Sequence, residues 1–350
     1  MTRRGGVGAA AAFFGALAAA LLGSPGCAQD AGPAEPPPSD DRTLILRMLD
    51  LGPEGLGGGG DALLLTDSTA TGQTHALVDG GPFGETDGEL RFGHVSRELS
   101  SLGVDTLAFA QVSHAHADHF LGVYALLEEL HVEIFVHNGQ RRRSDYGLHG
   151  ALLDRAKEKA DSVATLNELW EHRLGSGSGA TRTVHVPPLP DYLEEDLGAG
   201  GPDDHRKLNE GSIGTVVEVG GVRIFLAADG EDEAHDRWRT EFASLTRDVD
   251  ILKVGHHGAN NAVFDNRTGA GSRSSRWLAH TSPELQLVSA NGRSHPRRRA
   301  LERMEEVDGS RVYCTSTHGN VEVRVAGGEW TVSTERNGDA GCDPGAEAGT

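Results

Sequence analysis

Positively charged residues are scarce in this chain of 350 residues, which has 32 Lys and Arg against 52 Asp and Glu and a formal net charge of −20. Such an excess of acid repels polyanions over most of a protein surface. Only two dense basic clusters interrupt it, QRRRSD at 140–145 and HPRRRALER at 295–303. Short clusters of this kind are more often solvated faces than binding sites. The composition therefore argues against a general nucleic-acid-binding protein and confines such contacts to local patches.

Cysteine is also rare, since Cys27, Cys314 and Cys342 are the three examples. This number excludes a small domain built on a disulfide framework. In an oxidising compartment Cys314 and Cys342 are able to pair, and the bond would pin the Gly-rich C-terminal stretch to the rest of the chain. Two unpaired thiols are the equal alternative, because a sequence does not establish the geometry that a disulfide needs.

Long apolar runs are lacking except at the N-terminus. There two arginines precede an apolar stretch at 7–22, and small residues then lead to Cys27; this is the layout of a secretory signal peptide. The stretch is short for a membrane span, and an uncleaved N-terminal anchor helix is the alternative. Cys27 stands where a bacterial lipoprotein is cut and acylated. We expect an exported protein, periplasmic or on the outer surface, either free or lipid-anchored at Cys27.

Changes of composition along the chain divide it into four parts, and no internal repeat is evident. Residues 1–27 form the predicted signal peptide, of either the lipoprotein or the ordinary type. Residues 28–42 are rich in Pro, Ala and acid and cannot bury a core, which predicts a disordered tether. Residues 43–334 are predicted to form one domain, and residues 335–350 a flexible tail.

The middle of the chain alternates short β-rich runs with helical patterns. Predicted strands cover 42–49, 61–67, 75–81, 105–114, 132–138, 215–221, 222–231, 249–258, 285–291, 311–317, 321–328 and 329–334. Predicted helices cover 94–104, 118–130, 150–173, 238–245 and 296–306. Two mixed halves, each with a sheet and outer helices, indicate a layered α/β fold.

The densest polar motif is SHAHADHF, in which His114, His116, Asp118 and His119 follow a buried strand and open an amphipathic helix. His114 and His116 stand two residues apart in a turn, so both imidazoles are able to converge on one ion. Imidazole and carboxylate together suit a borderline cation such as Zn²⁺, and a catalytic site leaves one coordination position open for water. A solvated His-rich loop would not explain the apolar strand that precedes the cluster.

This His-x-His-x-Asp-His motif resembles the signature of the metallo-β-lactamase fold superfamily, and the resemblance extends over about residues 43–334. HALVDGG resembles an early strand of that family and ends at Asp79, FLAADGE resembles the strand that ends in its metal-bridging aspartate, and VGHHG resembles the turn with its last metal histidine. The resemblance implies a four-layer αβ/βα sandwich.

Within the superfamily, the chain is most similar to the hydrolase domain of ComEC-type competence proteins and its stand-alone relatives. The segments LDLG, GDA, LNEGSIGTVVEVGGVRIFLAADGE, VGHHG and ANGRSHP carry this likeness. The chain departs from the pattern through the inserted PEGLGGG and through Ser294, which replaces a glycine. It also lacks the middle metal histidine of typical lactamases, since neither His185 nor His205 has the expected Gly-His-Thr context. The first metal position is therefore short of one protein ligand.

The resemblance implies two divalent metal ions, with Zn²⁺ favoured and Mn²⁺ as the alternative. It implies the following ligands: His114 and His116 for the first ion, Asp118, His119 and either His256 or His257 for the second, and Asp229 as the bridge. We favour His257 over His256 because a glycine follows it. Asp79, Asn209 and Ser212 are expected to support ligands, and Asp118 to orient the attacking hydroxide. His295 is predicted to protonate the leaving oxygen or to stabilise charge on the non-bridging oxygens; capping of the following helix is the alternative.

The predicted function is that of an exported metal-dependent hydrolase, a phosphodiesterase or nuclease that uses a metal-bridged hydroxide. Hydrolysis of another bond, such as a lactone, a lactam or another ester, is the enzymatic alternative, because one fold hosts many chemistries. A non-catalytic metal-binding surface protein is the alternative of another class. The expected partner is a phosphodiester or nucleic-acid substrate; a membrane is contacted only through the N-terminus, and no obligate protein partner is evident.

Overall fold

A computed structural model describes residues 42–52, 59–82, 84–86, 89–91, 93–140, 147–177, 179–189, 202–266 and 271–345. The predicted signal peptide, nearly all of the predicted tether, Cys27 and most of the basic cluster at 140–145 lie outside these residues. The described residues belong to the unit that extends from Asp40 to Thr350.

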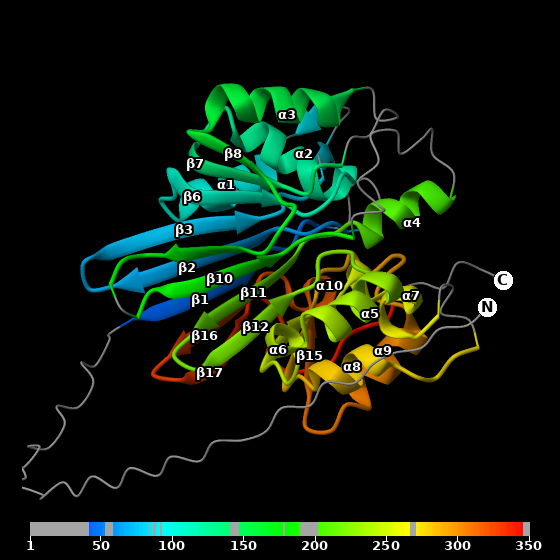
Figure 1. Cartoon of the computed structure of the whole chain (residues 1–350). Coiled ribbons are helices and arrows are strands. Elements are labelled where there is room, and N and C mark those ends of the chain that lie inside the picture. The colour runs from blue at the N-terminus through cyan, green and yellow to red at the C-terminus, as the bar shows by residue number, and fades with distance from the viewer. Residues whose placement is uncertain are drawn as a thin grey trace, which may run out of the picture. The chain divides into compact units, whose positions relative to one another are not determined.

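Two large sheets form the centre of this unit (Figure 1). The first has the order β17 (Glu329–Thr334), β16 (Val321–Ala326), β1 (Thr43–Met48), β2 (Leu63–Thr69), β3 (Gly72–Val78), β6 (Thr106–Val112), β7 (His131–His137) and β8 (Ser162–Thr165). The second has the order β15 (Arg311–Cys314), β14 (Leu285–Val288), β13 (Ile251–Lys253), β12 (Val222–Leu226), β11 (Gly214–Val219), β10 (Thr181–Val186) and β9 (Trp170–Leu174). A short hairpin pairs β4 (Gly84–Thr86) with β5 (Glu89–Arg91).

Helices cover the outer face of each sheet, as Figure 1 shows. The first sheet carries α1 (Gly93–Ser101), α2 (Ala117–Leu126) and α3 (Leu148–Lys159), and the second carries α5 (Asp232–Glu241), α6 (Ala243–Thr246), α8 (Arg276–Thr281) and α9 (Arg298–Glu305). Leu46, Phe109 and Ile224 belong to the apolar core between the sheets. Two further apolar clusters hold the helices to the sheets, with Phe120 in one and Trp238 in the other. The four-layer α/β sandwich is therefore confirmed.

The predicted helix at 150–173 is wrong in its second half. The helix α3 ends at Lys159, and the chain then forms β8 and β9. Val163 and Ala164 of β8 extend the first sheet beside β7, and Trp170 packs edge-on against Phe109. Val163 and Trp170 favour strands, and the tertiary environment offers them a sheet edge and an apolar surface, which overrides the local helical pattern.

The predicted helix at 238–245 begins too late in the sequence. In the structure α5 starts at Asp232, and a break at Phe242 separates it from α6. Asp232 and Glu233 occupy the first turn of α5, where negative charge interacts favourably with the helix dipole. This acidic start is a local signal for the earlier boundary.

The carboxyl ends of several parallel strands gather at one edge of the sandwich. In the first sheet β3, β6 and β7 run parallel, and in the second β12, β13, β14 and β15 do so. Glycine allows close packing there: a Cβ on Gly122 of α2 would collide with the carbonyl oxygen of Gly80. The second turn of α2 is thereby held directly against the loop that follows β3.

The C-terminal stretch to Gly345 is attached to the second sheet, unlike the flexible tail expected from 335 onward. A disulfide joins Cys314 to Cys342, the backbone N–H of Gly341 donates to Val312 O, and that of Gly345 donates to Pro296 O. The pairing that the sequence left open is therefore present.

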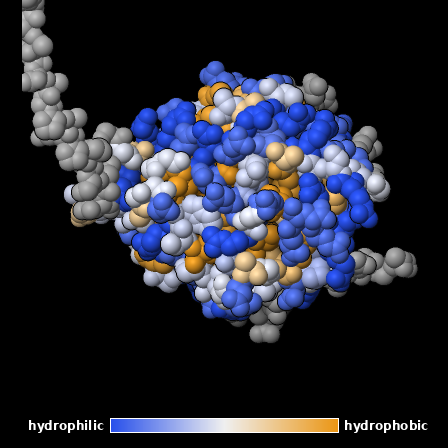
Figure 2. Space-filling model, turned by 90° about the horizontal axis from the view of Figure 1, so that it is seen from below, coloured by the Kyte–Doolittle hydropathy of each residue, from blue (hydrophilic) through white to orange (hydrophobic). Residues whose placement is uncertain are grey.

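The surface seen in Figure 2 is mostly hydrophilic, with hydrophobic residues in small groups. Among the described residues, no helix combines the length and the apolar character that crossing a membrane requires.

Candidate metal centre

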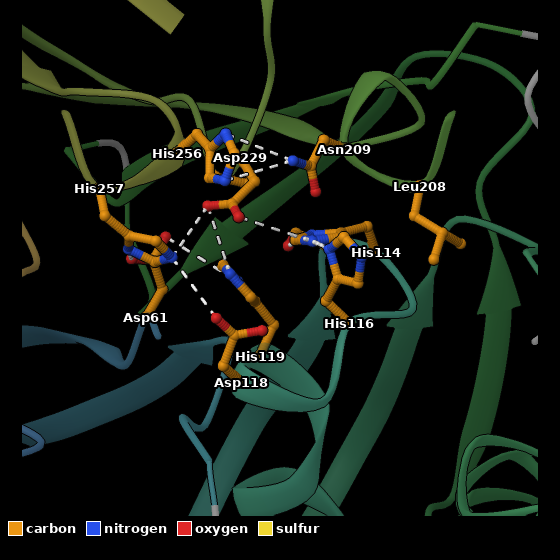
Figure 3. A network of polar contacts seen from close by, with 12 residues as sticks. Asp61, His114, His116, Asp118, His119, Leu208, Asn209, Asp229, His256 and His257 are labelled. Carbon is orange, nitrogen blue, oxygen red and sulfur yellow. Dashed lines mark hydrogen bonds and ion pairs between the residues drawn. The ribbon is translucent and has the colours of Figure 1, made fainter. Parts of the chain in front are cut away.

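The turn after β6 delivers three histidines to the edge where the strands end. His114 is fully buried and follows β6, and His116 stands just before the first turn of α2. The N–H of His119 donates to His116 O at 3.0 Å, which folds the motif back on itself. His114, His116 and His119 consequently point toward one region, as Figure 3 shows.

Asp79 fixes the ring orientation of two of these histidines. Its Oδ2 accepts hydrogen bonds from His119 Nδ1 at 2.8 Å and from Ser113 Oγ at 2.7 Å, and its Oδ1 accepts from Ser113 N at 2.8 Å. Because the Ser113 hydroxyl donates to Asp79, its oxygen accepts from His114 Nδ1 at 3.0 Å. Both histidines therefore keep an Nε2 lone pair for a cation. Asp79 therefore orients two of the candidate ligands.

His256 and His257 lie in the 3-10 helix η2 (His256–Gly258), with positive φ angles of 42° and 53°. Non-glycine residues in this region are strained, and such strain concentrates at functional sites. His257 Nδ1 donates to Ser289 O at 3.1 Å, which turns Nε2 toward Asp118 Oδ2 at 3.6 Å and Asp229 Oδ1 at 3.5 Å. His257 is thus the member of the pair that faces the other candidate ligands.

The donor atoms fit a bound cation, as the orphaned polar atoms indicate. His119 Nε2, His257 Nε2 and Asp229 Oδ1 are buried and have no hydrogen-bond partner, yet Asp229 Oδ1 lies 3.3 Å from His119 Nε2. Unpaired buried polar atoms are costly. The donor atoms of His114, His116 and Asp229 lie within 4.8 Å of one another, and so do those of Asp118, His119 and His257. Asp229 also groups in this way with Asp61 and His119, so it connects these two donor groups (Figure 3).

The charges of the metal-free site also favour a cation. Burial opposes ionisation of Asp229, but His257 and His119 hold its pKa well below the usual value. Burial likewise opposes protonation of His119, but Asp229 and Asp79 raise its pKa well above the usual value. A proton on His119 therefore neutralises part of the carboxylate charge when no cation does so. A metal ion displaces such a proton when it binds.

A buried ion pair supports the loops around the site, and it was not predicted from the sequence. Asp61 and Lys253 are fully buried and form a salt bridge. Ser289 Oγ donates to Asp61 Oδ1 at 2.6 Å, and Lys253 Nζ donates to Ala228 O at 2.9 Å. These contacts fix the loops that precede Asp229 and follow β14. In the sequence, the only sign of this pair was a single charged residue in each of two apolar runs, DALLL and ILKV.

His256 points to a different side of the site and binds a carboxylate. Its Nδ1 lies 3.0 Å from Glu231 Oε1, and Asn209 Nδ2 donates to the same oxygen at 2.7 Å. Burial lowers the pKa of His256, but Asp229 and Glu231 outweigh it and raise the pKa to about 9. His256 is therefore a cation beside the donor set. Asn209 supports this pair and not a metal ligand, and Glu231 was not singled out in the sequence.

His295 lies near both histidines of η2, with ring centroids 5.7 Å from His256 and 6.1 Å from His257. Burial and the neighbouring His257 lower the pKa of His295 to about 3, so its ring is neutral at physiological pH. The alternative role as a helix cap is wrong: Arg297 occupies the N-cap position of α9, and no side chain caps this end.

Two other residues of the intervening segment, Ser212 and His185, are not part of either donor group. Ser212 is fully buried, and its hydroxyl has no hydrogen-bond partner. His185 binds Gln111 Oε1 through Nδ1 and packs against Phe109.

His205, on α4 (Pro202–Glu210), contacts a candidate ligand, which the sequence did not predict. Its Nδ1 lies 3.0 Å from His116 Nε2, although it is not part of either donor group.

Comparison with known proteins agrees with this arrangement. The family model of the Metallo-beta-lactamase superfamily matches residues 55–268. The chain belongs to this superfamily. Its members are generally metal-dependent hydrolases whose fold holds two metal ions. No match was found among curated proteins.

Solved structures of low sequence identity also resemble the chain. The diiron β-hydroxylase CmlA of Streptomyces venezuelae is 17% identical with a TM-score of 0.46, and the match covers 83% of this chain and 55% of CmlA. YhfI of Bacillus subtilis is 11% identical with a TM-score of 0.44 over 83% of this chain and 99% of YhfI. A diphosphatase of the PhnP family is 10% identical with a TM-score of 0.42 over 81% of this chain and 98% of that protein. The chain thus spans about half the length of CmlA.

Proposed function

We propose that this protein is a two-metal phosphodiesterase of the ComEC-like branch, with Zn²⁺ as the favoured metal and Mn²⁺ as the alternative. The observation that carries the proposal is the pair His256–Glu231 beside Asp229. A phosphodiester is an anion, and it gains from a fixed cation next to the metal ligands. A neutral lactam or lactone has no comparable need for this charge.

Two divalent ions in this site would supply Lewis-acid catalysis, polarising the phosphoryl oxygens and lowering the pKa of a bound water. The chain's own residues then have separate tasks. Burial opposes ionisation of Asp118, but His257 and His119 lower its pKa, so its carboxylate stays ionised and accepts a hydrogen bond from the attacking water. His256 Nε2 donates a proton to the leaving oxygen, while Glu231 holds the ring through Nδ1.

Of the roles that the sequence suggested for His295, we propose that it contacts the substrate and does not donate the proton. Its depressed pKa leaves the ring neutral, and a neutral ring at this edge is suited to orienting the substrate through a hydrogen bond. The acid role is assigned to His256, because Glu231 lies 3.0 Å from its Nδ1 and stabilises the protonated ring.

A basic cavity formed by α9 and the segment after α7 (Asn260–Val263) supports a phosphate-containing substrate. Its volume is about 270 Å³, and it is lined by Phe264, Arg273, Arg298, Arg299, Glu302, Arg303 and Glu306. The Arg299 guanidinium lies 4.3 Å from the centroid of the Phe264 ring, which fixes its direction. Two of the chain segments that line the cavity continue from site loops: Arg298 begins α9 shortly after His295, and Phe264 follows η2 and α7. Against a net charge of −20, this cavity is a place where further phosphates of a strand could bind.

Export is part of the same proposal, with a free or Cys27-acylated protein in the periplasm or on the outer surface. The N-terminal sequence supports it, because its charged, apolar and small-residue regions follow the order of a signal peptide. Mass spectrometry of the protein purified from bacterial membranes and from soluble fractions tests it. A mature N-terminus at or near Cys27, with or without lipid, is expected, and an intact N-terminus would contradict cleavage.

The activity is tested with three substrates on metal-loaded protein: bis-p-nitrophenyl phosphate, single-stranded DNA and nitrocefin. Phosphodiester turnover that is lost in Asp118→Ala and in His119→Ala supports the proposal. Turnover of nitrocefin alone would assign the site to another bond, and bound metal without any turnover would favour a binding protein.

A further inference from the structure

Both ring nitrogens of His116 have close neighbours. Its Nδ1 lies 2.9 Å from His114 Nε2, and its Nε2 lies 3.0 Å from His205 Nδ1. The rings of His116 and His205 are stacked, with centroids 5.2 Å apart and planes inclined by 24°. One nitrogen of His116 therefore faces another candidate ligand, and the other faces a helix.

The hydrogen bonds of the neighbours determine which nitrogen of His116 serves a metal. His114 donates from Nδ1 to Ser113 Oγ, so His114 Nε2 is the atom with a free lone pair. His116 Nδ1 faces that atom and Asp229 lies on the same side, 3.9 Å from His114 Nε2. Without a metal, one of these two nitrogens donates to the other. A metal that took both lone pairs would bind His116 through Nδ1, and the proton of His116 would then sit on Nε2, where His205 Nδ1 accepts it.

The helix that carries His205 is attached to the metal site at several points. Gln140 accepts from Ala115 N at 3.2 Å through Oε1 and donates to Leu208 O at 3.2 Å through Nε2. One side chain therefore connects the histidine turn to α4. Farther along α4, Asn209 donates to Glu231. Leu208 also packs against Ala115. The position of His205 is set by these contacts and not only by its own hydrogen bond.

We propose that His205 is a positioning residue that holds His116 in the tautomer with an unprotonated Nδ1. Through this contact, helix α4 would support the first metal position. Metal-bound histidines almost always donate their second ring N–H to an acceptor, and loss of such an acceptor weakens metal binding about 10–100-fold. His205 thereby compensates in part for the missing middle histidine without being a ligand. The inference rests on the metal site of the proposed function but not on its substrate.

The test measures how fast each of the two Zn²⁺ ions leaves the full-length protein for a coloured chelator. The variants are His205→Ala, His205→Gln, whose amide oxygen is able to accept the His116 N–H, and His131→Ala as the control. His131 is an exposed histidine of the first sheet that pairs with Asp161 at 3.2 Å. The melting temperature without metal shows whether each variant folds.

We expect about tenfold faster release of one ion in His205→Ala, unchanged release of the other, and restoration by His205→Gln. Co²⁺-loaded protein should keep the same absorption band positions in His205→Gln, since no ligand changes. If each ion leaves every variant as fast as it leaves the wild type, the inference about His205 is overturned, but the proposed function is not. A changed Co²⁺ spectrum in His205→Gln also overturns it, because His205 would then be a ligand. Wild-type protein that binds no metal overturns the proposed function as well.

Discussion

The carboxylate of Asp79 accepts a hydrogen bond from His119 Nδ1 at 2.8 Å. The same oxygen accepts from Ser113 Oγ, which in turn accepts from His114. One buried aspartate therefore sets the tautomers of a histidine in each of the two donor groups. Asp79 itself adopts a positive φ of 58°, a strained conformation for a residue with a side chain.

Replacing Asp79 by Asn should weaken both metal positions. An amide cannot accept every hydrogen bond that the carboxylate accepts, so His114 and His119 lose their fixed orientation. We expect both ions to bind about 10–100-fold more weakly, as measured by titration against a competing chelator. This result differs from that of His205→Ala, which should affect one ion. Loss of a single ion in Asp79→Asn would show that the connection through Ser113 is unimportant.

Removing the proton donor should separate catalysis from metal binding. His256→Gln keeps the six candidate ligands, but it removes the proton and the positive charge. We expect kcat for bis-p-nitrophenyl phosphate to fall about 10²–10⁴-fold while bound metal, measured by elemental analysis, stays at the wild-type level. Glu231→Gln should give a smaller loss. A His295→Gln variant that loses more than His256→Gln would reverse the assignment of the two histidines.

His235 should make the metal-free protein less stable in acid. Burial lowers its pKa from 6.5 to about 3, and its ring is stacked on Trp277 with centroids 4.6 Å apart. The unfolded chain binds a proton below pH 6.5 while folded His235 stays neutral, so stability is present above that pH and is lost as pH falls. Between pH 7 and pH 5 the loss is about 2 kcal/mol.

A His235→Phe variant should therefore show a flatter dependence of stability on pH. The measurement is urea unfolding at pH 7 and pH 5 in the presence of a chelator. The matched surface variant His131→Phe should keep the wild-type dependence. An identical pH dependence in wild type and His235→Phe would mean that His235 is protonated in the folded protein.

The basic cavity should matter for long substrates only. In the double variant Arg298→Gln/Arg299→Gln we expect unchanged turnover of bis-p-nitrophenyl phosphate but weaker use of single-stranded DNA. The slope of log affinity against log salt should become less negative by about 0.7 for each phosphate that the variant no longer binds. Arg311→Gln is the control, because Arg311 also stacks on an aromatic ring, with its guanidinium 4.6 Å from the Trp330 centroid. Arg311 begins β15, away from the edge where the parallel strands end. Equal effects on both substrates would contradict a role in strand binding.

The sequence was sufficient for the layered fold and for the convergence of His114, His116, Asp118, His119, Asp229 and His257. These residues directly follow apolar strands, and the carboxyl ends of parallel strands meet at one edge. The sequence was insufficient where a contact depends on packing between distant segments. Asp61 and Lys253 are 192 residues apart and His116 and His205 are 89 residues apart, and neither pair has a local pattern. The strand β8 after Lys159 likewise forms because a distant segment, β7, offers it a sheet edge, and no local pattern shows this.

We propose that the six ligands bind metal for phosphodiester hydrolysis. The most direct measurement is kcat/KM for bis-p-nitrophenyl phosphate with wild type and Asp229→Asn, each after metal removal and after Zn²⁺ or Mn²⁺ is restored. We expect turnover only in metal-loaded wild type, and a fall of at least about 10³-fold in Asp229→Asn, because Asp229 would serve both metal positions. Turnover that survives metal removal, or that is the same in Asp229→Asn, would contradict the proposal.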